Sequence, residues 1–146
     1  SERLLALFGA ALRVDGPSIR VTGEQPLHGV CLTLPGDFSA AAFPIVAALV
    51  VPGSEVTLRS VGLNPRRTGL LRALAAMGAD IHVTPREERC GEPVGDLHVR
   101  HSPLRAADLP PELVPDMIDE LPIWAVAAAF ARGTSRASGL AELRHK

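Results

Sequence analysis

The sequence predicts an α/β fold in which one arrangement of helices and strands occurs twice. The stretches LLALFGAALRVDGPSIRVTG (residues 4–23) and LLRALAAMGADIHVTP (residues 70–85) each place apolar residues at helical spacing before a glycine and alternating apolar residues after it. Two alanine-rich stretches, each led by an aspartate, form the second recurring element, at residues 37–53 and 119–133. A unit repeated by duplication in this way is typical of helices packed on sheets.

In chain order the patterns predict helix–strand–strand, helix–strand, helix–strand–strand and helix–strand. The expected strands lie at 12–14, at 18–22, after Gly53, at 81–83, at 96–100 and after Gly133. The alanine-rich helices carry little polar surface, so we expect other elements to surround them. Residues 86–96, rich in Glu, Arg, Gly and Pro, are expected to form a loop, and the proline-rich residues 102–116 a connector.

The composition excludes several classes of function. The chain has 146 residues, of which 47% are hydrophobic, and this is enough for the core of one ordinary domain. A formal net charge of −1 and an aromatic content of 3% provide neither a basic patch nor a stacking platform for nucleic acid, and no attraction to an anionic membrane. The longest apolar runs are interrupted by Pro44 and Pro122 and are too short to span a bilayer.

The cysteines and histidines predict neither a metal site nor a disulfide framework. Cys31 and Cys90 lack the spacing of a CxxC motif, and the 5 histidines form no zinc pattern with them. We therefore expect no bound metal and a reduced, cytoplasmic setting.

Asp119 and Glu120 are adjacent carboxylates that we expect in the first turn of the last long helix. The exposed N–H groups and the dipole of a helix start favour an acid there, so capping alone would explain them. The same position also suits an acid held rigidly at the edge of a site. Asp37 is the equivalent residue before the earlier alanine-rich helix, and capping would explain it too.

Basic residues mark two further candidate positions. Arg66 and Arg67 follow Asn64-Pro65 at an expected helix start, where they could hold a phosphate or a carboxylate. Asn-Pro also forms turns, and turn chemistry with solvated arginines is the simpler interpretation. Arg144 and Lys146 at the end of the chain are, taken alone, an ordinary basic tail.

Three stretches together resemble the 5-enolpyruvylshikimate-3-phosphate synthase family, the 3-phosphoshikimate 1-carboxyvinyltransferases. They are residues 34–81, MIDELPIWAVAAAFARG (117–133) and GLAELRHK (139–146), and the resemblance is weakest over residues 86–115. It implies the fold of enolpyruvyl transferases, an inside-out α/β barrel with two halves, each built from three βαβαββ units. Residues 1–34 would then end the N-terminal half, and residues 35–146 would start the C-terminal half.

The resemblance also implies a reaction and the residues that perform it. Members of the family transfer the enolpyruvyl group of phosphoenolpyruvate to the 5-hydroxyl of shikimate 3-phosphate, without a metal or an organic cofactor. Asp119 matches the family's proton acceptor, which also hydrogen-bonds shikimate 3-phosphate, and Lys146 matches a lysine that binds the same substrate. Glu120 has no family role and is expected to be a cap, and Ser39 is assigned no ligand role.

Two other functions stay open at this point. The sister enzyme that transfers the same group to UDP-N-acetylglucosamine shares the fold, although IDELP and ELRHK match the shikimate-pathway pattern better. A non-enzymatic scaffold built from α/β repeats is the third possibility. As a fragment of a two-half enzyme the chain should be inactive alone, because catalysis needs groups from both halves, and the rest of the parent enzyme should pack against it.

Overall fold

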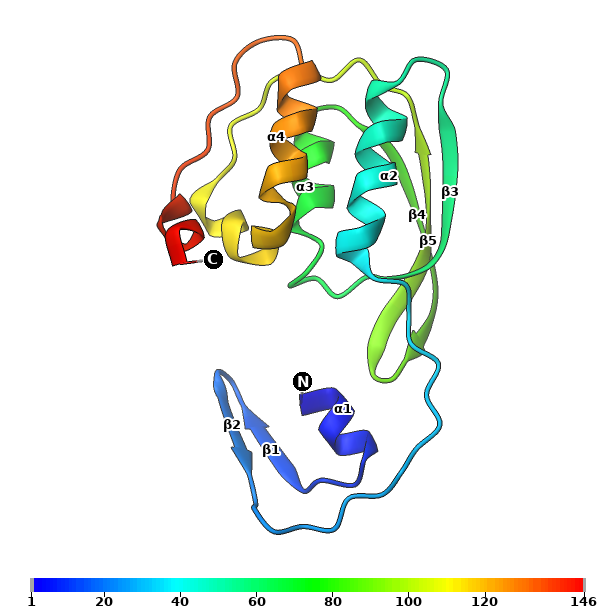
Figure 1. Ribbon diagram of the computed structural model, residues 1–146, viewed down its shortest axis with the longest axis vertical. Helices are drawn as coiled ribbons and strands as arrows, with labels where there is room; N and C mark the ends of the chain where they lie inside the picture. The colour runs from blue at the N-terminus through cyan, green and yellow to red at the C-terminus, as the bar shows by residue number, and fades with distance from the viewer. Residues whose placement is uncertain (1, 146) are drawn as a thin grey trace.

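The computed structural model describes residues 2–145 as two parts joined by a long crossover segment (Figure 1). The smaller part contains helix α1 (Glu2–Leu7) and the strands β1 (Leu12–Asp15) and β2 (Ser18–Val21). The two strands form an antiparallel hairpin in which Leu12 pairs with Val21 and Asp15 with Ser18. The helix and both strands predicted here are confirmed.

The larger part begins with one complete βαβαββ unit. Gly36 forms a parallel bridge to Val61 and acts as the first, minimal strand. The unit continues through α2 (Phe38–Val50), β3 (Glu55–Gly62), α3 (Gly69–Ala76), β4 (Asp80–Arg89) and β5 (Glu92–Arg100). The sheet order is β3-β5-β4, and both pairs are antiparallel. The prediction of an α/β fold with this unit is therefore confirmed.

The expected loop over residues 86–96 is wrong. β4 and β5 pair along their whole length, from Asp80 opposite Arg100 to Arg89 opposite Glu92, and only Cys90 and Gly91 form the turn. The polar residues of this stretch suit an edge strand, because charged side chains there discourage pairing with a further chain. Most of β4 is accordingly exposed.

The start of a second, incomplete copy of the unit follows the connector of residues 102–110. It contains two 3-10 segments, η1 (Pro111–Asp116) and η2 (Ile118–Glu120), then α4 (Leu121–Phe130), and finally the 3-10 segment η3 (Leu140–His145). Arg105 bridges Arg132 in parallel across α4, as Gly36 bridges Val61 across α2. The prediction of a strand after Gly133 is wrong. The chain makes only isolated bridges here, at Arg132 just before Gly133 and at Ala137 after it.

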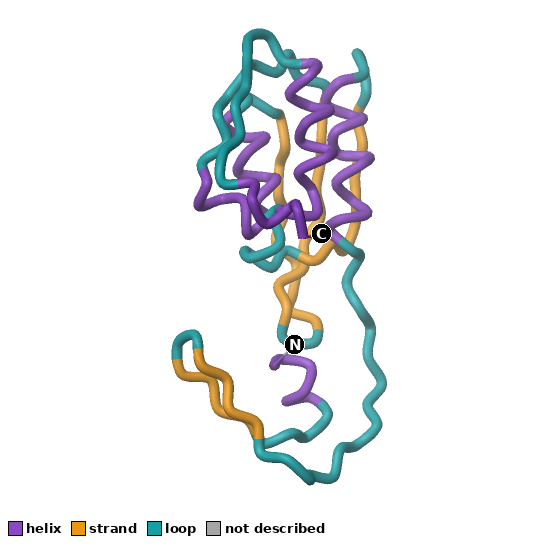
Figure 2. Tube along the Cα trace, turned by 60° about the vertical axis from the view of Figure 1, so that its left-hand side comes forward, coloured by secondary structure: helices purple, strands orange, loops and turns teal. Residues whose placement is uncertain are grey.

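The core lies between the sheet and helices α2, α3 and α4, which cover one of its faces (Figure 2). It is mainly aliphatic, as the composition predicts. Its most deeply buried large side chains are Ile45, Leu49, Leu70, Leu74, Met77, Leu97 and Met117. These residues come from the helices, from the central strand β5 and from η1–η2, so one contiguous core holds the larger part together.

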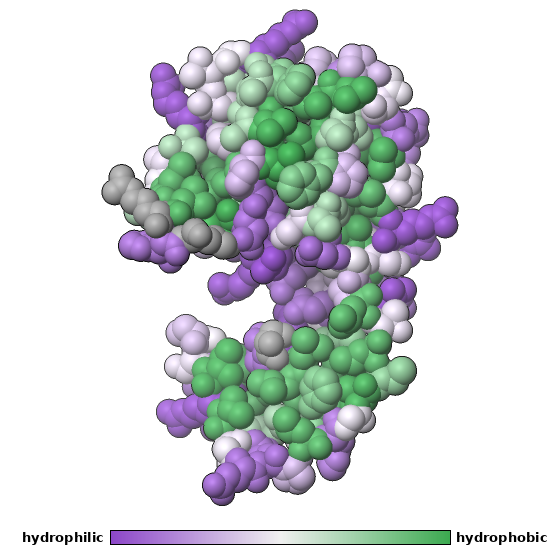
Figure 3. Space-filling view, in the orientation of Figure 1, coloured by the Kyte–Doolittle hydropathy of each residue, from purple (hydrophilic) through white to green (hydrophobic). Residues whose placement is uncertain are grey.

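The alanine-rich helices are covered on one side only, which corrects the expectation that other elements surround them. Phe43 of α2 and Phe130 of α4 are 63% and 65% exposed. Figure 3 shows hydrophobic residues over this outer face. Within residues 2–145, no helix has the length and apolar character needed to cross a membrane.

Candidate functional site

Helices α2, α3 and α4 begin at the same end of the larger part, the end that faces the N-terminal part (Figure 1). Figure 3 shows hydrophilic residues gathered at this end, above the hollow that separates the two parts. Asp37 caps α2, because its carboxylate accepts from the backbone N–H groups of Ser39 and Ala40, each at 3.2 Å. The capping interpretation of Asp37 is confirmed. The N-cap residues of α3 and α4, in contrast, make no side-chain capping hydrogen bond, and the N–H groups of a helix start favour negatively charged ligands.

The Asn64-Pro65 segment forms the turn that the sequence predicts. Asn64 Oδ1 accepts from the N–H of Arg66 at 3.0 Å, and the Asn64 carbonyl accepts from the N–H of Arg67 at 2.8 Å. The hydroxyl of Thr68 also donates to this carbonyl, at 3.2 Å. This turn sets the position of Arg67 immediately before α3, and the side chain of Arg67 is not merely solvated.

The adjacent carboxylates Asp119 and Glu120 lie in different environments. They belong to η2, a 3-10 turn before α4, and Glu120 makes no side-chain capping hydrogen bond there. Glu120 is 2% exposed, whereas the side chain of Asp119 is 38% exposed. The expectation that Glu120 acts as a helix cap is wrong, since its carboxylate points into the protein and accepts from the hydroxyl of Ser39 at 2.5 Å.

Four polar side chains form one connected cluster at this end of the larger part. Arg67 Nη2 donates to Ser39 Oγ at 3.3 Å and lies 3.6 Å from Asp119 Oδ2. Ser39 in turn donates to Glu120. The sequence predicted Asp119 and Arg67 as separate candidates but did not place them together, and it did not predict a role for Ser39. Ser39 and Glu120 are 81 positions apart, so no local pattern relates them.

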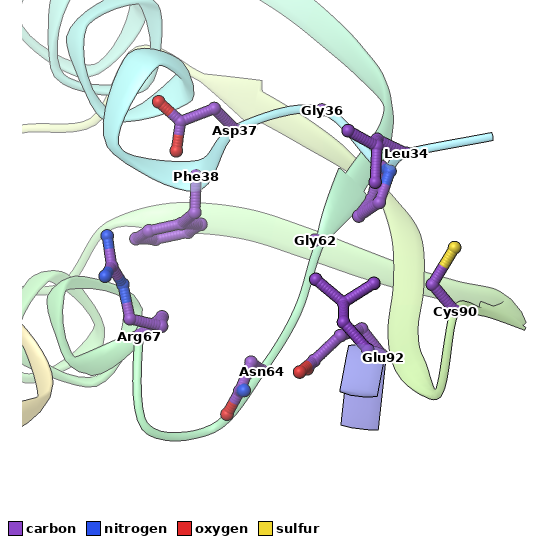
Figure 4. Close-up of a pocket in the computed structure, with 11 residues that line it drawn as sticks. Leu34, Gly36, Asp37, Phe38, Gly62, Asn64, Arg67, Cys90 and Glu92 are labelled. Carbon is purple, nitrogen blue, oxygen red and sulfur yellow. The ribbon is translucent and has the colours of Figure 1, made fainter. Parts of the chain in front are cut away.

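A cavity of about 460 Å³ adjoins this cluster (Figure 4). Asp37, Phe38 and Arg67 lie at one end of it, and Leu34 and Cys90 lie at the other. The crossover segment, the tip of the β4–β5 hairpin and Leu4 of α1 complete the walls. Asp119 does not line the cavity itself, but Arg67 contacts both the cavity and the Asp119 carboxylate. The arrangement places a cation and a half-exposed carboxylate at the edge of a space between the two parts.

The other predicted site residue, Lys146, lies outside the described residues. The structure therefore provides no position for its ammonium group, and the role of Lys146 stays a prediction. Across the described part of the chain, no group of three or more His, Cys, Asp or Glu side chains is placed to hold a metal ion.

Comparison with known proteins identifies the family. The family model described as EPSP synthase (3-phosphoshikimate 1-carboxyvinyltransferase) matches residues 1–146. The chain is 56% identical over its full length to the 3-phosphoshikimate 1-carboxyvinyltransferase of Xanthomonas campestris pv. campestris (strain B100), and 53% identical to that of Carboxydothermus hydrogenoformans. These matches cover 33% and 34% of the two relatives, so the chain spans about a third of their length.

Solved structures agree in fold as well as in sequence. An EPSP synthase from Acinetobacter baumannii superimposes with a TM-score of 0.88 at 40% identity, over 99% of this chain and 33% of that one. A second structure of the enzyme from the same organism gives a TM-score of 0.89 at 41% identity. The matching names favour neither the sister transferase nor the scaffold. By family model, sequence identity and structure, the chain belongs to the EPSP synthase family.

Proposed function

We propose that the chain is a segment of a 3-phosphoshikimate 1-carboxyvinyltransferase and that Asp119 is the proton acceptor of its reaction. The match over residues 1–146 supports the reaction, and one observation supports the residue. Asp119 is held beside the cation Arg67 at the end where three helices begin, with part of its carboxylate open to solvent. A carboxylate that only capped a helix would be directed at backbone N–H groups, as Asp37 is.

In the proposed reaction the 5-hydroxyl of shikimate 3-phosphate adds across the double bond of phosphoenolpyruvate. Its oxygen bonds to C2 as the hydroxyl proton passes to Asp119, and the π electrons of the C2–C3 double bond take up a proton at C3 from a second acidic group of the full-length enzyme. That group then takes the proton back from C3 while the C2–O bond to phosphate breaks, which restores the double bond in the enolpyruvyl ether. Phosphate leaves with the bonding electrons and carries away the proton held by Asp119. A hydroxyl is a weak nucleophile, so a positioned base is worth about 10²–10⁴ in rate.

The remaining groups of the site belong to the same proposal. Lys146 would bind shikimate 3-phosphate and steady charge at the reacting oxygen. Residues 1–34 would end the N-terminal half of the enzyme and residues 35–146 would start the C-terminal half, with the site between them. The absence of buried residues over positions 2–37 supports a boundary there. Two free cysteines support a reduced, cytoplasmic setting.

The other parts of the enzyme are expected to pack on this segment. The exposed apolar face of α2 and α4, which includes Phe43 and Phe130, is suited to this contact. Catalysis also needs groups from outside the 146 residues, so the isolated chain is expected to be inactive.

The test is turnover of shikimate 3-phosphate and phosphoenolpyruvate by the full-length polypeptide that includes this segment, with and without Asp119→Asn. We expect the variant to lose about 10²–10⁴ in kcat, because it keeps the shape of the side chain but not the base. Asp116→Asn is the matched control, since the Asp116 carboxylate pairs with Arg72 of α3 instead of with Arg67, and the variant should keep full activity.

Two results would overturn this proposal. An active parent whose Asp119→Asn variant matches it would remove the role of Asp119. A parent that turns over UDP-N-acetylglucosamine in place of shikimate 3-phosphate would identify the sister transferase. No enolpyruvyl transfer to either acceptor would leave the scaffold as the function to test.

A further inference from the structure

We propose that Arg67 is the positioning residue for Asp119, and that Ser39 and Glu120 anchor Arg67 in that place. This inference rests on the proposed function, because it assigns a partner to the acid that takes the proton. It goes further in naming three residues that share one task. The sequence predicted a cap at Glu120, a candidate anion-binding position at Arg67 and no ligand role for Ser39. It therefore related none of the three to Asp119.

The contacts form a closed ring that joins three separate elements. Arg67, before α3, lies 3.6 Å from the Asp119 carboxylate and donates to Ser39 at 3.3 Å, both through Nη2. Ser39, in the first turn of α2, donates to Glu120 at 2.5 Å. Glu120 is the next residue along the chain after Asp119, so the peptide bond between them closes the ring. A shift of Asp119 along η2 would therefore disturb every contact in it.

The buried end of the ring makes it rigid. Glu120 is 2% exposed, and a carboxylate taken out of water is tolerated only when it is hydrogen-bonded. Its bond to Ser39 is a charge-assisted one, the stronger kind. Ser39 is fixed independently, because its backbone N–H donates to the capping carboxylate of Asp37. The hydroxyl that accepts from Arg67 thus has a defined position.

Arg67 is also held at its own base. The turn around Asn64 fixes its backbone through the 2.8 Å bond from its N–H to the Asn64 carbonyl. The side chain of Phe38, which is buried, lies beside it in the cavity (Figure 4). The direction of the Arg67 guanidinium is then set by the two contacts of Nη2, with the Asp119 carboxylate and with the Ser39 hydroxyl.

Stability does not account for this arrangement. The side chains of Arg67 and Asp119 are 56% and 38% exposed, and an ion pair of that exposure adds little to folding. The position of Asp119 is expected to matter for the catalytic rate, because displacing a base by about 1 Å can lower the rate about 10²-fold. Loss of the Arg67–Asp119 ion pair is therefore expected to lower kcat and to have little effect on the free energy of unfolding.

A double-mutant cycle in the full-length polypeptide tests the proposal. Arg67→Gln is expected to lower kcat by about 10–100-fold, with KM for both substrates changed less than threefold. Arg67→Lys, which keeps the cation but not the guanidinium geometry, should recover part of the loss. Arg72→Gln is the matched control, because it removes an Arg–Asp ion pair from the adjoining helix without touching the ring. Circular dichroism and thermal melting should show every variant folded.

The decisive step is Arg67→Gln in the Asp119→Asn background. If Arg67 acts through Asp119, the second substitution should add no further loss, since the base that it positions is already gone. Multiplied losses would overturn the proposal, and so would a loss confined to KM, which would make Arg67 a ligand of an anionic substrate. These results leave the role of Asp119 intact. An Asp119→Asn variant with full activity would overturn both proposals.

Discussion

Residues 2–34 and the larger part from residue 36 onward contain similar local elements but differ in burial. No residue between positions 2 and 37 is buried, whereas the larger part encloses one continuous core. The exposed large apolar residues of the N-terminal part are Leu5, Leu7, Val14, Ile19, Val21, Leu27, Val30 and Leu34. Turn chemistry and strand pairing are thus enough to specify a helix and a hairpin, but not to bury their apolar side chains.

Polar contacts join the two parts at the tip of the β4–β5 hairpin. Arg3 donates to the carbonyl of Gly91 at 2.6 Å and forms an ion pair of 3.0 Å with Glu92 at the tip of the β4–β5 hairpin. Exposed pairs of this kind contribute at most about 1 kcal/mol. The exposed apolar residues of the N-terminal part are therefore expected to pack against other parts of a full-length enzyme, since the chain spans about a third of the length of its relatives.

The largest expected effect contrasts one strand residue from each part. Leu97 in β5 is 0% exposed and Ile19 in β2 is 50% exposed. Leu97→Ala should lower the free energy of unfolding of the 146-residue chain by about 2–5 kcal/mol, because it opens a cavity in the core. Ile19→Ala should change it by less than about 0.5 kcal/mol. Urea denaturation measures both.

Leu97→Ala and Ile19→Ala can also be compared in the full-length polypeptide. There Ile19→Ala is expected to become costly, because the remaining chain would cover the face on which Ile19 lies. Equal losses in the free energy of unfolding for the two substitutions in the 146-residue chain would contradict the difference in burial between the two parts.

A smaller effect is expected at the start of α2. Asp37→Ala removes the acceptor for two backbone N–H groups and should cost about 1 kcal/mol of stability. Asp37→Asn keeps an acceptor in place and should cost a few tenths of that amount. Chemical denaturation of both variants is the measurement, and equal losses would show that charge, not capping, holds the helix start.

The smallest expected effect depends on pH and tests a polar link within the sheet. The Arg86 guanidinium, helped by the N–H of Ser60, holds the pKa of the Asp96 carboxyl below its usual value. A lowered folded-state pKa means that the stabilisation is present above the ordinary carboxyl pKa of about 3.9 and is lost as the pH falls through the folded value. The difference in the free energy of unfolding between the wild type and Asp96→Asn should therefore decrease between pH 7 and about pH 3.

Arg86→Gln provides the control for this experiment. This substitution removes the main cause of the lowered Asp96 pKa and keeps the carboxylate. The free energy of unfolding of Arg86→Gln should therefore depend on pH less than that of the wild type, as in Asp96→Asn. Urea denaturation at several pH values compares the three proteins. An advantage that stays constant down to pH 3 would contradict the proposed link.

Features that depend on neighbouring residues were predictable from the sequence. Gly9 and Gly78 end their helices with φ angles of 89° and 83°, in the left-handed region that glycine enters without strain. Asp37 caps the helix that follows it, and Asn64 closes a turn. Helical periodicity and turn residues act over a few positions, so these predictions needed no knowledge of the rest of the molecule. Recognition of the family motifs likewise used contiguous stretches.

Contacts between residues far apart in the chain depend on tertiary packing, and the sequence did not predict them. Residues 86–96 look like a loop by composition, but they form the end of the edge strand β4, the turn at Cys90 and Gly91, and the start of the central strand β5. Asp119 and Glu120 are adjacent and chemically alike, yet packing of η2 against α2 buries one and leaves the other beside Arg67. Their different environments depend on the contacts of Ser39 with Glu120 and with Arg67, which lie 81 and 28 positions away from it in the sequence. Local patterns carry no information about contacts between residues so far apart.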